Sequence, residues 1–151
     1  MSLAIGVDVG GTKIAAGVVD EQGQIIAQLR RPTPAHDTAA TATAIAEMAA
    51  ELAAEHPVTS IGVGAAGFVG ADRQTVLFAP NLAWRDEPLG RLVSEATGLP
   101  TVIENDANAA GWGEARHGAA KDADSAVVIT VGTGIGGAII TGGRLQRGSN
   151  G

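Results

Sequence analysis

Short apolar runs separated by glycine-rich turns open the chain and predict three antiparallel strands. The runs cover residues 3–9, 14–19 and 24–29. The turns between them fall at residues 10–13 and 20–23. Short strands joined by tight turns pair with their neighbours in sequence, so this region is expected to form a meander. Pro32 and Pro34 are expected to end it, because proline restricts the residue before it.

The pattern then changes to helical spacing in an alanine-rich segment. Its larger apolar side chains recur every three or four residues, at Ile45, Met48, Ala49 and Leu52. This period predicts an amphipathic helix over residues 38–55. Asp37 or Thr38 is expected to cap it, and His56-Pro57 to end it.

Strands and helices alternate along the rest of the chain. Strands are predicted at residues 60–64, 101–104, 126–131 and 138–141, a hairpin at 68–78, a loop at 79–87, and helices at 88–97 and 106–116. The helix at 88–97 is expected to begin at Pro88 and end at Gly98. A lone hairpin is marginally stable. The pattern therefore predicts an α/β protein, with a first domain at residues 1–107 and the beginning of a second, incomplete domain at 108–151.

Composition narrows the class of protein. The chain has 151 residues, 45% apolar, with a net charge of −6 and no cysteine. An acidic chain lacks the basic surface that nucleic acid requires, and without cysteine it has neither disulfides nor cysteine-bound metal. Neither a secretory signal nor a membrane-spanning apolar run is recognisable. We expect a soluble, cytoplasmic protein that binds neither nucleic acid nor membrane. The 22 glycines indicate tight turns or backbone close to ligands.

The first glycine turn carries candidate phosphate chemistry. It consists of Gly10, Gly11, Thr12 and Lys13, directly after Asp8 and Val9. Glycine lets backbone N–H groups approach phosphate oxygens, and the threonine and lysine add donors. Asp8 is a candidate ligand of Mg²⁺, with water between the carboxylate and the ion. The alternative is an ordinary hairpin turn with a solvated lysine. The turn is not a Walker A loop, because the spacing differs and a strand follows.

The second glycine turn, with Gly132, Thr133 and Gly134, repeats the pattern of strand, turn and strand. Residues 62–67 and 132–137 both match Gly-x-Gly-x-x-Gly, but this motif indicates dinucleotide binding only where a helix follows. Strand-like residues follow both. We therefore favour two hairpins that grip a triphosphate from both sides, with a cleft between the domains.

A strand runs directly into a helix at Asn105 and Asp106. The carboxyl ends of strands are the usual ligand-binding edge of α/β folds. A carboxylate there can accept the proton of a sugar hydroxyl that attacks phosphorus, and an amide can bond neighbouring hydroxyls. The alternative is that one of the two residues only caps the helix.

Five motifs in this order resemble the ROK family of sugar kinases and repressors, in particular its bacterial glucokinase-like members. They are Asp8-Val9-Gly10-Gly11-Thr12-Lys13, Gly62-Val63-Gly64-Ala65-Ala66-Gly67-Phe68, Asn81-Leu82-Ala83-Trp84, Glu104-Asn105-Asp106-Ala107-Asn108-Ala109-Ala110 and Thr130-Val131-Gly132-Thr133-Gly134-Ile135-Gly136-Gly137. The resemblance spans nearly the whole chain.

The resemblance implies a ribonuclease H-like, actin-like ATPase fold and ATP-dependent phosphorylation of a hexose, with glucose the expected substrate. It implies ATP and Mg²⁺ between the two glycine turns and Asp106 as the general base. Gly67 and Asn105 would contact the sugar, and Asn81 is a further sugar-site candidate.

The chain departs from the family pattern in length. Family members continue for about as much chain again, through a Glu-x-Gly-His sugar segment, a zinc site and the adenine site. We therefore expect a truncated N-terminal half without the family zinc site, which could be inactive alone. The full-length protein is expected to be a homodimer. Alternatives are a non-catalytic or regulatory sugar- or nucleotide-binding protein, and a kinase that uses another hexose or polyphosphate. A repressor would need a DNA-binding domain before Asp8.

Overall fold

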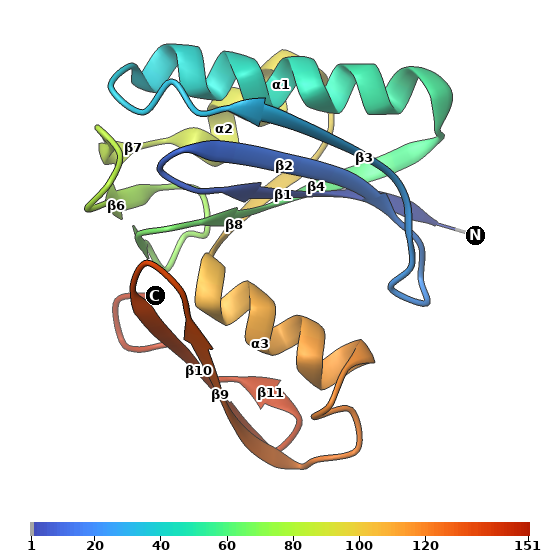
Figure 1. Cartoon of the computed structure of the whole chain (residues 1–151), viewed down its shortest axis with the longest axis vertical. Helices are drawn as coiled ribbons and strands as arrows, with labels where there is room; N and C mark the ends of the chain where they lie inside the picture. The colour runs from blue at the N-terminus through green and yellow to red at the C-terminus, as the bar shows by residue number, and fades with distance from the viewer. Residues whose placement is uncertain (1) are drawn as a thin grey trace.

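A five-stranded mixed sheet forms the centre of the protein, of which the computed structural model describes residues 2–151 (Figure 1). Its strands are β1 Leu3–Val9, β2 Lys13–Val19, β3 Ile25–Pro32, β4 Val58–Ala65 and β8 Thr101–Asn105, in the order β3-β2-β1-β4-β8. The first three pair antiparallel, and β4 and β8 add parallel strands. The predicted meander is confirmed.

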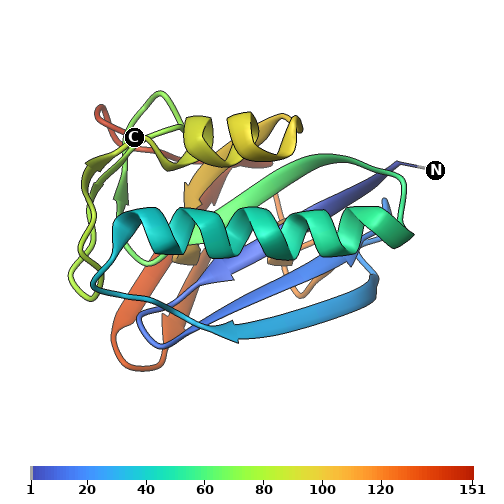
Figure 2. The same cartoon turned by 90° about the horizontal axis from the view of Figure 1, so that it is seen from above.

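Two helices cover one face of this sheet, α1 (Thr38–Glu55) and α2 (Leu89–Thr97), as Figure 2 shows from above. The Asp37 side chain accepts a hydrogen bond from the amide of Ala40 and caps α1. Gly98 ends α2 with a left-handed φ of 72°, which favours glycine. The core between the helices and the sheet includes Ile5, Ile14, Ile45, Met48, Ile61, Trp84, Leu89 and Ile103.

On the opposite side, α3 (Asp106–His117) lies between the central sheet and a second sheet (Figure 1). The second sheet has the order β11-β10-β9, with β9 Ser125–Val131, β10 Ile135–Thr141 and β11 Arg144–Leu145. The backbones approach closely here, because a Cβ atom at Gly111 of α3 would overlap that of Ala138 in β10. A Cβ atom at Gly136 would lie 2.7 Å from the Cβ of Ala107.

A third, small sheet consists of β5 Phe68–Val69, β6 Val76–Phe78 and β7 Arg85–Glu87. The predicted hairpin is confirmed, but the loop predicted at 79–87 is wrong at its end, where β7 pairs with β6. The β7 sequence Arg-Asp-Glu has no apolar alternation, so its pairing is set by tertiary structure. β10 begins at Ile135, which shortens the second glycine turn to residues 132–134. The short strand β11 was also not predicted.

The sheet order, with an antiparallel meander followed by two parallel strands, confirms the predicted α/β class and the ribonuclease H-like arrangement. Both Gly-x-Gly-x-x-Gly segments are followed by strands, β5 and β10, as expected. Within residues 2–151, none of the helices has the length and apolar character needed to cross a membrane.

Candidate functional site

The first glycine turn connects β1 to β2 directly after Asp8 and Val9, and a neighbouring segment holds it in place. The Gly10 amide donates to the Lys13 carbonyl oxygen at 3.0 Å. The Thr33 hydroxyl donates to the Gly10 carbonyl oxygen at 2.8 Å, and the Thr33 amide donates to the Thr12 carbonyl oxygen. The side chains of Thr12 and Lys13 remain exposed. The turn is therefore fixed in shape, with its donors available.

At the junction of β8 and α3, Asn105 and Asp106 have different tasks. The Asn105 side-chain oxygen accepts the amide of Asn108 at 3.0 Å, so Asn105 is the N-cap. Its amide nitrogen donates to the Gly67 carbonyl oxygen at 3.0 Å. Asp106 is the first helical residue and is exposed; among residues 2–151, its carboxylate accepts a bond only from the adjacent Ala107 amide. Capping is thus done by Asn105, which leaves most of the Asp106 carboxylate uncommitted.

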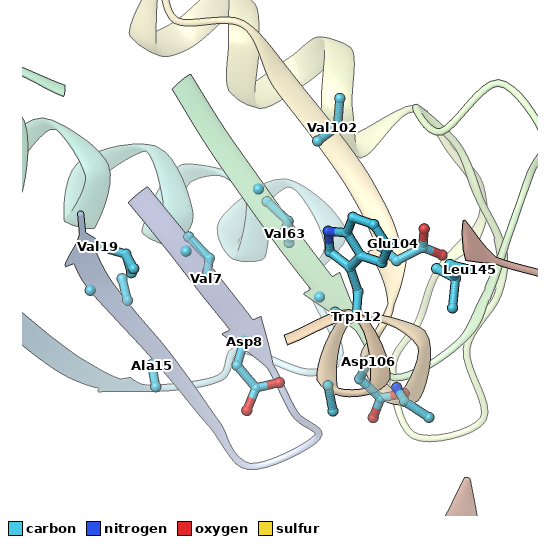
Figure 3. Close-up of a pocket in the computed structure, with 18 of the residues that line it drawn as sticks. Val7, Asp8, Ala15, Val19, Val63, Val102, Glu104, Asp106, Trp112 and Leu145 are labelled. Atoms are coloured by element: carbon cyan, nitrogen blue, oxygen red, sulfur yellow. The ribbon is translucent and has the colours of Figure 1, made fainter. Parts of the chain in front are cut away.

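Asp8 and Asp106 line one open cavity of about 990 Å³ (Figure 3). The cavity lies between the uncovered face of the central sheet and α3, and Thr130 of β9 also lines it. Figure 3 shows the two carboxylates at the same end of the sheet, with Asp8 near the end of β1 and Asp106 directly after β8. This is the edge at which the sequence predicted ligand binding.

The electrostatics of the cavity confirm that the carboxylates influence each other. Burial by the surrounding protein raises the pKa of Asp8, and the negative charge of Asp106 raises it further. The Lys13 ammonium lowers it and partly offsets both effects. Although solvent reaches the Asp8 side chain, the sheet and α3 displace enough water around it to disfavour the charged form. A cation at this place would relieve the repulsion.

The second glycine turn lies at the same end of the molecule as the first, as both Figure 1 and Figure 2 show. The Gly132 amide donates to the Gly134 carbonyl oxygen at 2.9 Å, and the turn is exposed. Its base is tied to α3, because Gly136 lies against Ala107. The tip of this turn, at Thr133 and its neighbours, is therefore open to solvent.

Asn81 lies beside the first glycine turn, although it is distant in sequence. A Cβ atom at Gly11 would be 3.1 Å from the Cβ of Asn81. The Asn81 side chain is exposed, whereas Leu82 and Trp84 after it are buried and anchor the loop. The structure thus places Asn81 next to Gly11 and Asn105 next to Gly67. Asp8 and Asp106 line the same cavity.

Sequence reasoning missed Glu104, Arg73 and Arg147, which also line the cavity; each of the two arginines forms an ion pair with Glu104. Glu104 stands directly before Asn105, so its place in the motif was a signal. Arg147 follows β11, a strand that was not predicted, so the sequence carried no signal for its role.

The comparisons with known proteins agree with this geometry. The model of the ROK family matches residues 4–151. The chain belongs to the ROK family. It is 51% identical over 148 residues to a glucokinase of Streptomyces coelicolor, covering 98% of this chain and 46% of that protein.

Solved structures of the family superpose over nearly the whole chain. A ROK family glucokinase from Streptomyces griseus, in complex with glucose and AMPPNP, has a TM-score of 0.94 and 52% identity, over 99% of this chain and 48% of that one. An inorganic polyphosphate/ATP-glucomannokinase from Arthrobacter has a TM-score of 0.88 and 34% identity, over 99% of this chain and 62% of that one. The ROK sugar-kinase fold is confirmed, and the chain spans about half the length of the curated relatives that it matches.

Proposed function

We propose that this chain supplies the N-terminal half of an ATP-dependent hexose kinase with glucose as its preferred acceptor. The observation that carries the proposal is the Asp106 carboxylate. It is exposed at the start of α3, free of the capping role, and lines the same cavity as Asp8. The similarity to ROK glucokinases, one of them bound to glucose and AMPPNP, supports the choice of substrates.

The proposed reaction requires one proton acceptor and one leaving group. Asp106 takes the proton from the sugar hydroxyl as the hydroxyl oxygen forms its bond to the γ-phosphorus. The bond from that phosphorus to the β–γ bridging oxygen breaks, and ADP leaves. Because Asn105 holds Gly67 through its amide, the two sugar-site candidates form one unit beside Asp106. Asn81 is proposed to complete the sugar side.

The nucleotide is proposed to lie between the two glycine turns. Gly10 and Gly132 donate their amides within the two turns and so fix their shape. The donors to the phosphates would come from Gly11, Thr12 and Lys13 on one side and from Thr133 and Gly134 on the other. Mg²⁺ supplies positive charge to the phosphates when bound.

Asp8 suits Mg²⁺. Mg²⁺ keeps much of its water and commonly takes one or two carboxylates together with phosphates. Residues 2–151 hold no group of three or more potential metal-ligating His, Cys, Asp or Glu side chains. Burial and the charge of Asp106 disfavour the negative charge of Asp8, and a hydrated cation that arrives with the nucleotide would stabilise that charge.

We also propose that residues 1–107 and 108–151 belong to two domains that close on the substrates, and that the natural protein is a homodimer. The expected boundary falls within the first turn of α3, directly after Ala107. Closure would then bring the second glycine turn towards the first.

A kinase assay that couples product to NADPH formation tests the function. We would compare this chain with the natural full-length protein, using ATP, Mg²⁺ and glucose. We expect turnover in the full-length protein and little in this chain, because family members take part of the sugar site from the second half of their chain. Absence of turnover in both, across a panel of hexoses and with polyphosphate as donor, would favour a binding or regulatory role.

Replacing Asp106 by asparagine tests the proposed base. Since general-base catalysis contributes about 10²–10⁴-fold, Asp106→Asn should lower kcat of the full-length protein by at least two orders of magnitude. ATP affinity, measured by calorimetry, should change little. Asp122→Asn, an exposed acid beyond α3, is the matched control. Retained turnover in Asp106→Asn would refute the assignment.

A further inference from the structure

The carboxylate of Glu104, at the end of β8, is the meeting point of three distant segments. Its Oε1 atom accepts the Asn105 amide at 3.0 Å and the Asn108 side-chain amide at 3.2 Å. Its Oε2 atom accepts Nε of Arg147 at 2.8 Å and a second bond from the same guanidinium. Nη2 of Arg73 lies 3.5 Å from the same oxygen. Both oxygens are therefore fully used.

This cluster differs from the surface ion pairs of the protein. The Glu104 side chain is only 13% exposed, whereas both partners of the Arg91–Glu95 pair are 62% exposed. Nε and Nη2 of Arg147 both donate to the single Oε2 atom, and charge-assisted bonds of this kind are strong. Because the Glu104 side chain is sheltered, removing Arg147 would leave its charge poorly compensated. The cluster can thus hold the positions of the segments that it connects, and it neutralises the charge of Glu104.

The backbone conformation at Arg73 also supports a special role for the Glu104 cluster. Arg73 has a positive φ of 54°, which is unfavourable for a side chain of its kind. Its carbonyl oxygen accepts the amide of Ile103 in β8. Its Nε atom is buried without a hydrogen-bond partner among the described residues. The hairpin between β5 and β6 accepts an unfavourable conformation that places a guanidinium beside Glu104.

The bonds of Glu104 converge on the element that carries Asp106. Oε1 holds the amide of Asn105, which precedes Asp106, and the side chain of Asn108, which lies in the first turn of α3. Oε2 holds Arg147, which follows β11. The carboxylate therefore connects the start of α3 with the segment that leaves the second sheet.

We propose that Glu104 is a positioning residue for the phosphoryl transfer, which with Arg147 holds the β8–α3 junction, and through it Asp106, in the orientation that accepts the proton. The inference rests on the proposed kinase function. A general base must lie within hydrogen-bond reach of the attacking hydroxyl, and a small misplacement can cost about 10²-fold in rate. Glu104 contacts neither substrate in this scheme, so its loss should affect kcat more than the KM for ATP.

The test uses the natural full-length protein and the substitutions Glu104→Gln, Arg147→Gln and both together. Each single variant should lower kcat about tenfold or more, with the KM for ATP within about twofold of wild type. The double variant should be no slower than the slower single variant, because both remove the same interaction. Glu95→Gln, which breaks the exposed Arg91–Glu95 pair, should leave kcat unchanged.

Melting temperatures, measured beside the kinetics, separate positioning from folding. If Glu104→Gln does not fold, Arg147→Gln carries the test. Arg147→Lys should restore activity only in part, since a lysine ammonium cannot place two donors of fixed geometry on Oε2 as the guanidinium does. Single variants that keep kcat within twofold of wild type would overturn the role of Glu104 and leave the kinase function standing. A wild-type protein without kinase activity would overturn both.

Discussion

Replacing Gly111 by alanine tests how closely α3 is packed on the second sheet. A methyl group at Gly111 would overlap the Cβ atom of Ala138 in β10 and would lie 3.6 Å from the Cβ of Val128. The Cβ atom of Ala138 is fixed by the backbone of its strand and cannot rotate away. Either α3 or β10 would therefore have to move to accept the new atom.

Gly113, in the same helix, provides the matched control. No atom lies within 4 Å of a Cβ placed there, and the residue is exposed. Alanine in place of a helical glycine gains about 1 kcal/mol, whereas overpacking a tight contact costs about 1–3 kcal/mol. Gly113→Ala should therefore raise the free energy of unfolding by about 1 kcal/mol. The free energy of unfolding of Gly111→Ala should be about 1–3 kcal/mol lower than that of Gly113→Ala.

Urea unfolding followed by circular dichroism measures this difference. At about 2–4 °C per kcal/mol for a chain of this size, the two melting temperatures should also differ by several degrees. The double variant Gly111→Ala/Ala138→Gly removes the overlapping atom and should recover part of the loss. If Gly111→Ala is as stable as Gly113→Ala, the close contact between α3 and β10 is wrong.

Two further predictions concern charge and packing. Because the pKa of Asp8 in the folded protein lies above its ordinary value of 3.8, its contribution to stability is full below that pH and is lost as pH rises through the raised pKa. Asp8→Asn should therefore make the protein more stable at neutral pH and flatten this part of the pH dependence, which urea unfolding across the acid range will measure; an unchanged slope would contradict the raised pKa. Trp84 is 1% exposed and Trp112 39%, so Trp84→Ala should cost about 3–5 kcal/mol and Trp112→Ala far less. Equal losses in urea unfolding would show that Trp84 is not a core residue.

Much of the central sheet could be predicted from the sequence, because its signals are local. The meander follows from apolar runs between turns, and α1 follows from its period and from Asp37 as cap. β7 could not be predicted, since Arg85 to Glu87 are charged and pair with β6 only through the tertiary fold. The length of the second turn depends likewise on where Gly136 meets Ala107.

Some residues of the candidate site could likewise be predicted from the sequence, and others could not. Asp8 and Asp106 were found because each stands at the end of a strand, but whether Asn105 or Asp106 caps the helix was open from the residues alone. The structure assigns the cap to Asn105 through its bond to the Asn108 amide. Arg147 could not be found, because its approach to Glu104 depends on the path of the chain after β11.

Asp8 and Asp106 are both attached to the central sheet, but Asp106 is also linked to the second sheet. Asp8 lies one residue before the end of β1, whereas Asp106 follows β8 directly and begins α3, which is packed on the second sheet through Gly111 and Ala138. A tilt of α3 that follows the second sheet would therefore turn Asp106 about the β8–α3 junction and change the separation of the carboxylates. Because Asp106 is one cause of the raised pKa of Asp8, that pKa reports the separation. Substrates that close the proposed cleft would change the protonation of Asp8, and Lys13 and Mg²⁺ would oppose the repulsion at the moment when it is greatest.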